Sequence, residues 1–309
     1  MLRYILKRCL YALITLWVIA TITFGLMKIL PGDPFNDPKL KPDVKATLIK
    51  QYGLDKSIPE QYALYMKNLM RGDLGTSLKF PGRSVTKMIQ ESFPKSFALG
   101  WRAMVIAVAF GLTFGIIAAL NHQKVFDYFT IFIAIIGISV PSIVMGPILV
   151  YTFGVNLGWL PVTVDGTQIS YLLPSLTLAL GSVAFISRLM RTTTLEVLNQ
   201  DYIVTAKSKG ITKRKIVWSH VIRNAIMPVV TVLGPLFAAL ITGSIVIEKI
   251  FAVAGLGEYF VSTIFLKDYP MIMGITIFYA ALIIASILMI DIIYGFIDPK
   301  LRVTGRRGR

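Results

Sequence analysis

Long stretches of uncharged, apolar residues alternate with polar segments along most of this chain. Six such runs lie at residues 9–27, 103–120, 128–164, 170–187, 226–247 and 271–290. Each is as long as the roughly 18–20 residues that a helix needs to cross a bilayer. The pattern therefore predicts an all-α polytopic membrane protein with six transmembrane helices.

The ends of the runs place the helices along the chain. The first helix is expected within residues 1–30 and is expected to be retained, because its apolar core is too long for a signal peptide and leads into Pro31 and Gly32. The other five are predicted at about 98–120, 129–152, 170–189, 226–247 and 271–292.

The one long polar section, residues 31–97, separates the first two predicted helices and contains eleven Lys and Arg residues. Two apolar stripes in it have helical spacing. One follows a possible N-cap at Ser84, and the other is formed by Tyr62, Tyr65, Met66, Leu69 and Met70. We expect a small helical external subdomain on the membrane surface, with the aromatic stripe used for packing.

The third run is interrupted by proline. Ser139, Pro141 and Ser142 lie inside the predicted 129–152 helix, where proline frees a backbone carbonyl that neighbouring hydroxyls can satisfy. Such a break is either a kink that serves packing or part of a polar pathway, and the pattern does not choose between them.

Composition narrows the class of protein. The 309-residue chain is 55% hydrophobic and 16% charged, which leaves too little polar surface for a soluble protein of this size. Its net charge of +16 is explained by membrane topology and anionic lipid, because most basic residues lie at the ends of the runs, and nothing supports nucleic-acid binding. The basic N-terminus and tail predict that both chain ends lie inside. The 121–127 turn and the 188–227 segment are also expected inside, and loops 153–170 and 248–270 outside.

Candidate catalytic chemistry is scarce. The single cysteine, Cys9, excludes an internal disulfide and a Cys-rich metal site, and only two histidines, His122 and His220, argue against a His-based metal site. The chain has no phosphate-binding G-x-x-x-x-G-K-[ST] loop, no G-x-S-x-G elbow and no H-E-x-x-H helix. We therefore expect no cofactor and no enzymatic activity of its own.

A basic segment between the fourth and fifth runs is the strongest candidate for a functional site. Residues 191–223 contain seven Lys or Arg residues and two acids. A helix-friendly stretch ends at Gly210, which tolerates the positive φ of a helix C-terminus, and Thr212 can N-cap a second helix. The sequence predicts two short helices around a turn. A docking surface and a plain basic inside loop both fit this pattern.

This segment resembles the cytoplasmic loop of bacterial ABC-importer permeases, whose pattern is E-A-A, three residues, Gly, nine residues, Ile, one residue, Leu-Pro. Ala206 and Gly210 match it, and Ile222 lies near its Leu, whereas Val204, Thr205, His220 and Arg223 depart from it. Longer strings are more specific: L-P-G-D-P, Y-G-L-D-K-S-I-P-E-Q-Y, D-Y-x-x-T-A-x-x-K-G, H-x-x-R-N-A-x-x-P, I-E-K-I-F-x-V-x-G-L-G and D-I-I-Y-G-F-I-D-P-K. Together they are similar to the B-type permease of the oligopeptide and dipeptide importers.

The resemblance implies a type I ABC-importer permease core at 98–297, followed by a basic cytoplasmic tail at 298–309. It implies a multi-pass protein of the bacterial cytoplasmic membrane that forms half of a peptide pathway. The implied partners are a second homologous permease, two cytoplasmic ATPases that hydrolyse ATP, and an external peptide-binding lipoprotein. The coupling loop at 190–225 would receive force from an ATPase through Asp201, Thr205, Ala206, Lys207, Gly210, Ile211, Thr212, Lys213 and Arg223.

Two carboxylates near the predicted helix ends, Glu248 and Asp291, are candidates for the pathway, together with Ser139, Pro141 and Ser142. For Asp291 the favoured interpretation is a surface position or a pairing with Lys300 or Arg302 of the tail, rather than a direct role in the pathway. Other functions remain open at this stage: a permease for dipeptides or nickel complexes, an ion-coupled carrier, or a membrane scaffold that recruits a partner without transport.

Overall fold

The computed structural model describes residues 2–29, 42–51 and 53–297 of the chain, and within these the regular elements are helices. A single antiparallel bridge, Thr76 to Ser84, is the only β-pairing among the described residues. The elements are α1 (Leu2–Ile29), α2 (Pro42–Gln51), α3 (Ile58–Met70), α4 (Val85–Leu120), α5 (Val125–Ser139), α6 (Ser142–Leu149), the π-helix η1 (Val150–Asn156), the 3-10 turn η2 (Ile169–Tyr171), α7 (Leu172–Leu198), α8 (Asp201–Ser208), α9 (Lys213–Ile216), the π-helix η3 (Val217–Val221), α10 (Ile222–Ala225), α11 (Met227–Ile241), α12 (Ile245–Ile250), α13 (Leu256–Leu266) and α14 (Tyr269–Ile297).

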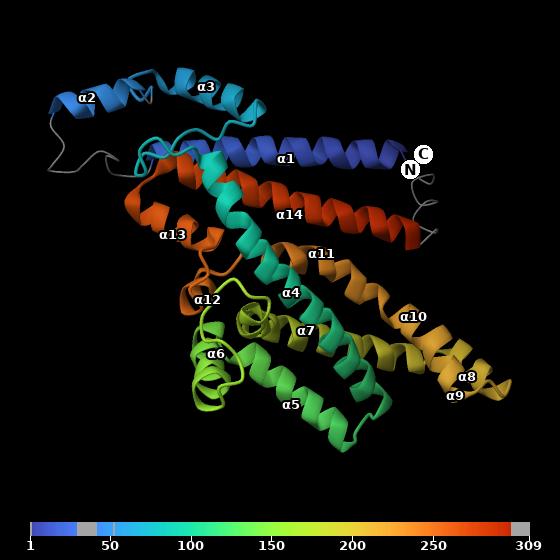
Figure 1. Ribbon diagram of the computed structural model, residues 1–309. Coiled ribbons are helices and arrows are strands. Elements are labelled where there is room, and N and C mark those ends of the chain that lie inside the picture. The colour runs from blue at the N-terminus through green and yellow to red at the C-terminus, as the bar shows by residue number, and fades with distance from the viewer. Residues whose placement is uncertain (1, 30–41, 52, 298–309) are drawn as a thin grey trace. The chain divides into compact units, whose positions relative to one another are not determined.

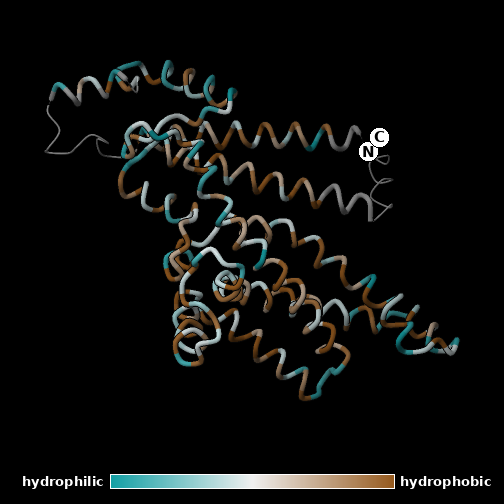
Figure 2. Tube along the Cα trace, in the orientation of Figure 1, coloured by the Kyte–Doolittle hydropathy of each residue, from teal (hydrophilic) through white to brown (hydrophobic). Residues whose placement is uncertain are grey.

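Four of these helical stretches are long and apolar enough to cross a membrane: Leu6–Ile29, Val85–Leu120, Ile169–Leu198 and Tyr269–Ile290. Two bent pairs, Val125–Ser139 with Ser142–Asn156 and Lys213–Ala225 with Met227–Ile241, pass the same test together, which raises the number of candidate spans to as many as six. The expectation of an all-helical polytopic membrane protein is confirmed. Figure 2 shows the apolar residues running along α1 and α14, and polar residues gathered on α8 and α9.

The predicted helix at 129–152 is wrong as a single element. α5 ends at Ser139, and the chain turns by 111° before α6 and η1. Proline causes the break: Val140, which precedes Pro141, is extended (ψ 115°), and Pro141 is itself extended (ψ 144°) as the N-cap of α6.

Three other helix boundaries in the structure also differ from the predicted ones. α4 begins at Val85 and not near 98, and it continues through Pro94. α7 continues to Leu198, so the first nine residues of the predicted 190–225 loop are helical. α11 ends at Ile241, because Gly243 has a φ of +82° that no helix accommodates, and α12 follows as a separate element.

The chain divides into two compact units. The first contains Met1–Pro94 and Leu256–Leu282. In it, Phe24 of α1 packs edge-to-face on Tyr62 and stacks on Tyr65, so the aromatic stripe of α3 serves packing as expected, with α3 alongside α1 in Figure 1. The start of α4 forms a separate buried cluster with α13 and α14, made of Val85, Met88, Ile89, Leu256, Met271 and Ile275.

Buried Asp268 fixes the 71–84 segment of the first unit to the start of α14. Its carboxylate accepts the Ser77 hydroxyl and the backbone N–H groups of Leu78, at 3.1 Å, and Met271, at 3.4 Å. These bonds satisfy the carboxylate of Asp268, which is 0% exposed.

The second unit contains Lys95–Gly255 and Ile283–Arg309. Its core lies between α4, α7 and α11, where α4 approaches α7 through Gly111 and Gly115. A Cβ at Gly111 would lie 2.7 Å from the Ile186 side chain, and one at Gly115 would lie 2.6 Å from the Ser187 carbonyl oxygen. These two glycines, spaced as G-x-x-x-G, therefore let α4 and α7 approach closely.

Candidate functional site

The connector between α7 and α11, residues 199–226, folds as predicted into two short helices around a turn. α8 ends at Ser208 with Lys209 as its C-cap, and Gly210 follows with a φ of +72°. The Gly210 N–H donates to the Lys207 carbonyl at 3.0 Å, and the Ile211 N–H donates to the Ala206 carbonyl at 3.2 Å. This pair of hydrogen bonds is a Schellman motif, which needs a residue that tolerates positive φ.

A small core of its own holds the connector together. Thr212 is the N-cap residue of α9 by position, although its side chain makes no capping hydrogen bond. Ile203 and Ala206 of α8 pack there against Ile216 of α9 and Val221 of η3, all at most 7% exposed. The two short helices therefore form a folded element with a defined surface.

Most of the predicted coupling residues lie on that surface. Ala206 is the exception, because it is buried in the connector core, and Ile211 is half-buried beside it. The exposed residues are Asp201, Thr205, Lys207, Gly210, Thr212, Lys213 and Arg223.

Two exposed apolar side chains were missed as candidates. Val204 is 54% exposed and Trp218 is 66% exposed, so the basic surface also carries apolar area. Exposed aromatic residues are typical of binding sites. A tryptophan within an otherwise polar, basic segment is the signal that would have found Trp218.

A hydrogen bond, in addition to the backbone, joins the connector to α7. The Thr193 hydroxyl, buried on α7, donates to the Ala225 carbonyl of α10 at 2.8 Å. α7 itself runs without a break from Leu172 to Leu198. The connector is therefore joined to an unbroken helix by this hydrogen bond as well as by the backbone.

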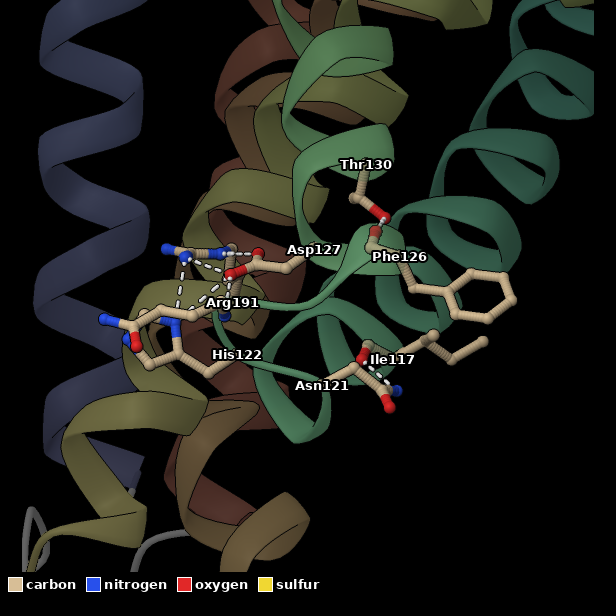
Figure 3. Close-up of polar contacts among 8 residues, drawn as sticks. Ile117, Asn121, His122, Phe126, Asp127, Thr130 and Arg191 are labelled. Atoms are coloured by element: carbon tan, nitrogen blue, oxygen red, sulfur yellow. Dashed lines mark hydrogen bonds and ion pairs between the residues drawn. The ribbon is translucent and has the colours of Figure 1, made fainter.

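An ion pair anchors α7 to the first turn of α5, where Asp127 lies (Figure 3). Arg191 Nε donates to Asp127 Oδ1 at 2.6 Å, and its Nη2 donates to Oδ2 at 2.8 Å. The Asp127 side chain is only 2% exposed. Its Oδ2 also accepts the Gln123 N–H at 2.9 Å and lies 3.1 Å from His122 Nδ1.

This arrangement joins groups that are 64 residues apart in the sequence. The bidentate geometry is the strong form of an arginine–carboxylate contact. It also supports Gln123, which has a φ of +61° although it is not glycine. Sequence reasoning used Arg191 and Asp127 only as markers of helix ends, because no spacing rule links residues so far apart.

The pathway candidates at the α5–α6 bend are exposed. Ser139 and Ser142 flank the break at Pro141, and neither hydroxyl forms a hydrogen bond with the described part of the chain. An open groove of about 580 Å³ lies along α5 and α7 of the same unit, lined by Gly137, Ile138, Gly181, Phe185, Arg188, Leu189 and Thr192. Arg188 is the charged residue of that groove and was not selected from the sequence.

Glu248 lies elsewhere, in a buried cradle of the second unit. It is 0% exposed, and its Oε1 accepts the Ser96 hydroxyl at 2.7 Å. A Cβ at either Gly243 or Gly255 would collide with its carboxylate, so these glycines make room for it. Glu248, which the sequence offered as a pathway candidate, is therefore enclosed within this unit. The Asp291 side chain lies outside the described residues.

Metal chemistry finds no support in the described residues, where no group of three or more His, Cys, Asp or Glu side chains could hold an ion. The connector instead presents an exposed basic surface with apolar area at Val204 and Trp218.

Comparison with known proteins gives consistent matches over nearly the whole chain. Residues 111–303 match the family model described as binding-protein-dependent transport system inner membrane component, and residues 1–100 match the model for the N-terminal part of such membrane components. The chain is 45% identical over 304 residues to the dipeptide transport system permease protein DppB of Bacillus subtilis, covering 98% of this chain and 99% of that protein. It is 41% identical over 305 residues to the oligopeptide transport system permease protein OppB of Haemophilus influenzae and 39% identical to that of Salmonella typhimurium, in both cases over 98% of this chain and 100% of the relative.

Proposed function

We propose that this chain, which belongs to the family of binding-protein-dependent transport system inner membrane components, is a membrane subunit of an ATP-driven peptide importer. The observation that carries the proposal is full-length similarity to permeases whose names state dipeptide or oligopeptide transport. The apolar helices fit a multi-pass protein of the bacterial inner membrane.

The proposed topology has six spans, with each bent helix pair counted as one. The basic N-terminus, connector and tail lie in the cytoplasm, because Lys and Arg concentrate on that side. The section at 31–97 then lies outside, although the start of α4 at Val85 shows that its last residues continue directly into the second span. This topology corresponds to the type I architecture of ABC-importer permeases.

The proposed partners are a second homologous permease, two cytoplasmic ATPases and an external peptide-binding lipoprotein. ATP hydrolysis takes place in the ATPases. One of them docks on the connector, where Lys207 and Lys213 supply positive charge and Trp218 supplies apolar area. Both features are typical of a protein-binding surface.

Movement of the docked ATPase would be transmitted by the contacts already described. The Schellman turn and the core of the connector keep it rigid, and the Thr193–Ala225 hydrogen bond carries its displacement to α7. The Asp127–Arg191 pair extends that rigid body to α5. Tilting of α5 and α7 would alternate which side of the membrane the pathway faces, and ATP biases the change only by favouring one of the two states.

The proposed pathway runs along the face of α5 and α7 that carries the groove with Arg188 and leads to the break at Pro141. Ser139 and Ser142 there have hydroxyls available for a peptide backbone. Glu248, being buried and hydrogen-bonded, is assigned to holding the turn between α11 and α12. Dipeptides and longer peptides both remain candidate substrates, because relatives of each name match at similar identity.

The test is uptake of a labelled peptide by vesicles that contain the complete importer, with Gly210→Val compared with Gly210→Asn. Valine is strained at a φ of +72°, whereas asparagine tolerates it. We expect the valine variant to assemble but lose most ATP-dependent uptake and the asparagine variant to retain it. Uptake driven by a proton gradient without nucleotide would instead support an ion-coupled carrier, and uptake unaffected by Gly210→Val would contradict a coupling role. Partner binding without uptake under any condition would support a scaffold.

A further inference from the structure

The first unit contains a cavity of about 370 Å³ that the proposed transport function does not use. Its walls come from the end of α1, from α2 and the turn before α3, from α3, from the 71–84 segment and from the start of α14. This volume is within the roughly 300–1,000 Å³ range of small-molecule binding sites. The character of its lining indicates which ligand it fits.

Positive charge dominates the polar part of the lining. Lys28, Lys50 and Lys56 line the cavity, and none of them forms an ion pair with a described carboxylate. The one carboxylate in the lining, Asp73, already accepts the Gly75 N–H at 2.9 Å. Three cationic groups against one engaged carboxylate favour an anionic ligand.

The rest of the lining is largely apolar. Phe24 and Met27 of α1, Leu64 of α3 and Met273 of α14 face the same cavity. Lys28 lies between the charged and the apolar parts of the lining. Its Nζ donates to Gln61 Oε1 and lies 5.4 Å from the centre of the Phe24 ring. A ligand that satisfies both parts must carry an anionic head and an apolar chain.

Tyr65 adds an unused hydrogen-bond donor. It lines the cavity, and its hydroxyl is buried with no hydrogen-bond partner in the described part of the chain. Buried polar groups without partners are uncommon and costly. Burial raises the pKa of Tyr65 to about 12, so the hydroxyl keeps its proton at neutral pH and can donate to an anionic oxygen.

The cavity also lies where a lipid headgroup would be found. The apolar stretch of α1 ends at Ile29, and the apolar stretch of α14 begins at Tyr269, so both membrane-crossing helices leave the hydrocarbon layer beside it. We propose that this cavity binds the headgroup of an anionic phospholipid, with its phosphate among Lys28, Lys50, Lys56 and the Tyr65 hydroxyl and its acyl chain against Phe24 and Met27. Such a lipid would fix α3 to α1.

The experiment measures the affinity of the purified full chain, in uncharged detergent, for dioctanoyl phosphatidylglycerol, dioctanoyl phosphatidylcholine and inorganic phosphate. Affinity is taken from the rise of the thermal-unfolding midpoint with ligand concentration. The double variant Lys50→Gln/Lys56→Gln removes two exposed charges of the cavity. The matched control, Lys67→Gln/Lys87→Gln, removes two exposed charges of the same unit that do not line it.

Phosphatidylglycerol should bind saturably to the wild-type chain and to the control. At ~1 kcal/mol for each lysine near an anionic lipid, the cavity double variant should bind about 30-fold more weakly. Tyr65→Phe should bind about tenfold more weakly, because it loses one hydrogen bond to a charged group, worth ~1.5 kcal/mol.

Three results would overturn the proposal. Equal affinity for phosphatidylcholine would remove the requirement for a negative headgroup, and equal affinity for inorganic phosphate would make the site one for a free anion. Wild-type affinity in the cavity double variant would place the lipid elsewhere on the protein.

Discussion

Replacing Arg191 with glutamine tests the ion pair that joins α7 to the first turn of α5. The change removes two charge-assisted hydrogen bonds, at 2.6 and 2.8 Å, from a carboxylate that is 2% exposed. A hydrogen bond to a charged group contributes ~1.5–3 kcal/mol, and breaking a buried pair by removing one partner costs ~3–5 kcal/mol. The Arg191 side chain is 20% exposed, and the Gln123 N–H still binds the carboxylate in the variant. We therefore expect the free energy of unfolding to fall by about 3 kcal/mol, the lower end of the range for a broken buried pair.

The free energy of unfolding is measured on the purified chain in mixed micelles with increasing dodecyl sulfate, followed by the loss of helical circular dichroism. Asp127→Asn and the double variant Asp127→Asn/Arg191→Gln complete a double-mutant cycle. Since either single change already breaks the pair, the double variant should cost little more than Arg191→Gln alone, with a coupling energy of at least ~1.5 kcal/mol.

Arg188→Gln is the matched control, because Arg188 is exposed on the same helix and is not paired with Asp127. It should change stability by less than ~0.5 kcal/mol. The anchoring role of the pair would be refuted if the effects of the two single substitutions on the free energy of unfolding simply added in the double variant. It would also be refuted if Arg191→Gln lowered that free energy by less than ~0.5 kcal/mol.

Two further substitutions, one in each unit, test how the helices pack. Asp268→Asn removes the buried carboxylate that holds the 71–84 segment, and we expect it to lower the free energy of unfolding by about 2–3 kcal/mol. The segment should also be cleaved faster by protease. Proteolysis unchanged from wild type would count against this role. Gly100→Ala places a methyl group 2.6 Å from the Ile241 Cα and should lower the free energy of unfolding, measured by heat or denaturant, by ~1–3 kcal/mol. The control is Gly25→Ala, which should be neutral or slightly stabilising because nothing lies within 4 Å of the added Cβ. Equal effects of the two alanines would show that α4 and α11 do not approach as closely as described.

Local patterns in the sequence predicted much of this fold. Uninterrupted apolar runs predicted the membrane-crossing helices, and Gly210 with Thr212 predicted the turn of the connector and the start of α9. Each of these features depends on residues that are close together in the chain, so periodicity and capping chemistry were enough to find them.

Features that depend on distant contacts could not be predicted in the same way. Pro141 predicted a break but not the 111° turn, which depends on how α6 packs against other helices. The second helix was predicted to begin near residue 98, yet α4 begins at Val85 and continues through Pro94, because its first turns are held by the buried cluster at Val85 and Met88. The partners of Asp127 and Glu248 lie 64 and 152 residues away, so only the folded structure shows them.

Cross-linking of the assembled importer tests most directly whether the connector is the docking site of the ATPase. Lys213→Cys, in a Cys9→Ser background, places a thiol on the exposed connector, and Thr163→Cys places one on the exposed segment between η1 and η2. With a photoactivatable maleimide, we expect the variant at position 213 to form a covalent product with an ATPase subunit and the variant at position 163 to form none. A product formed only from position 163, or no ATPase product from the connector, would contradict the account.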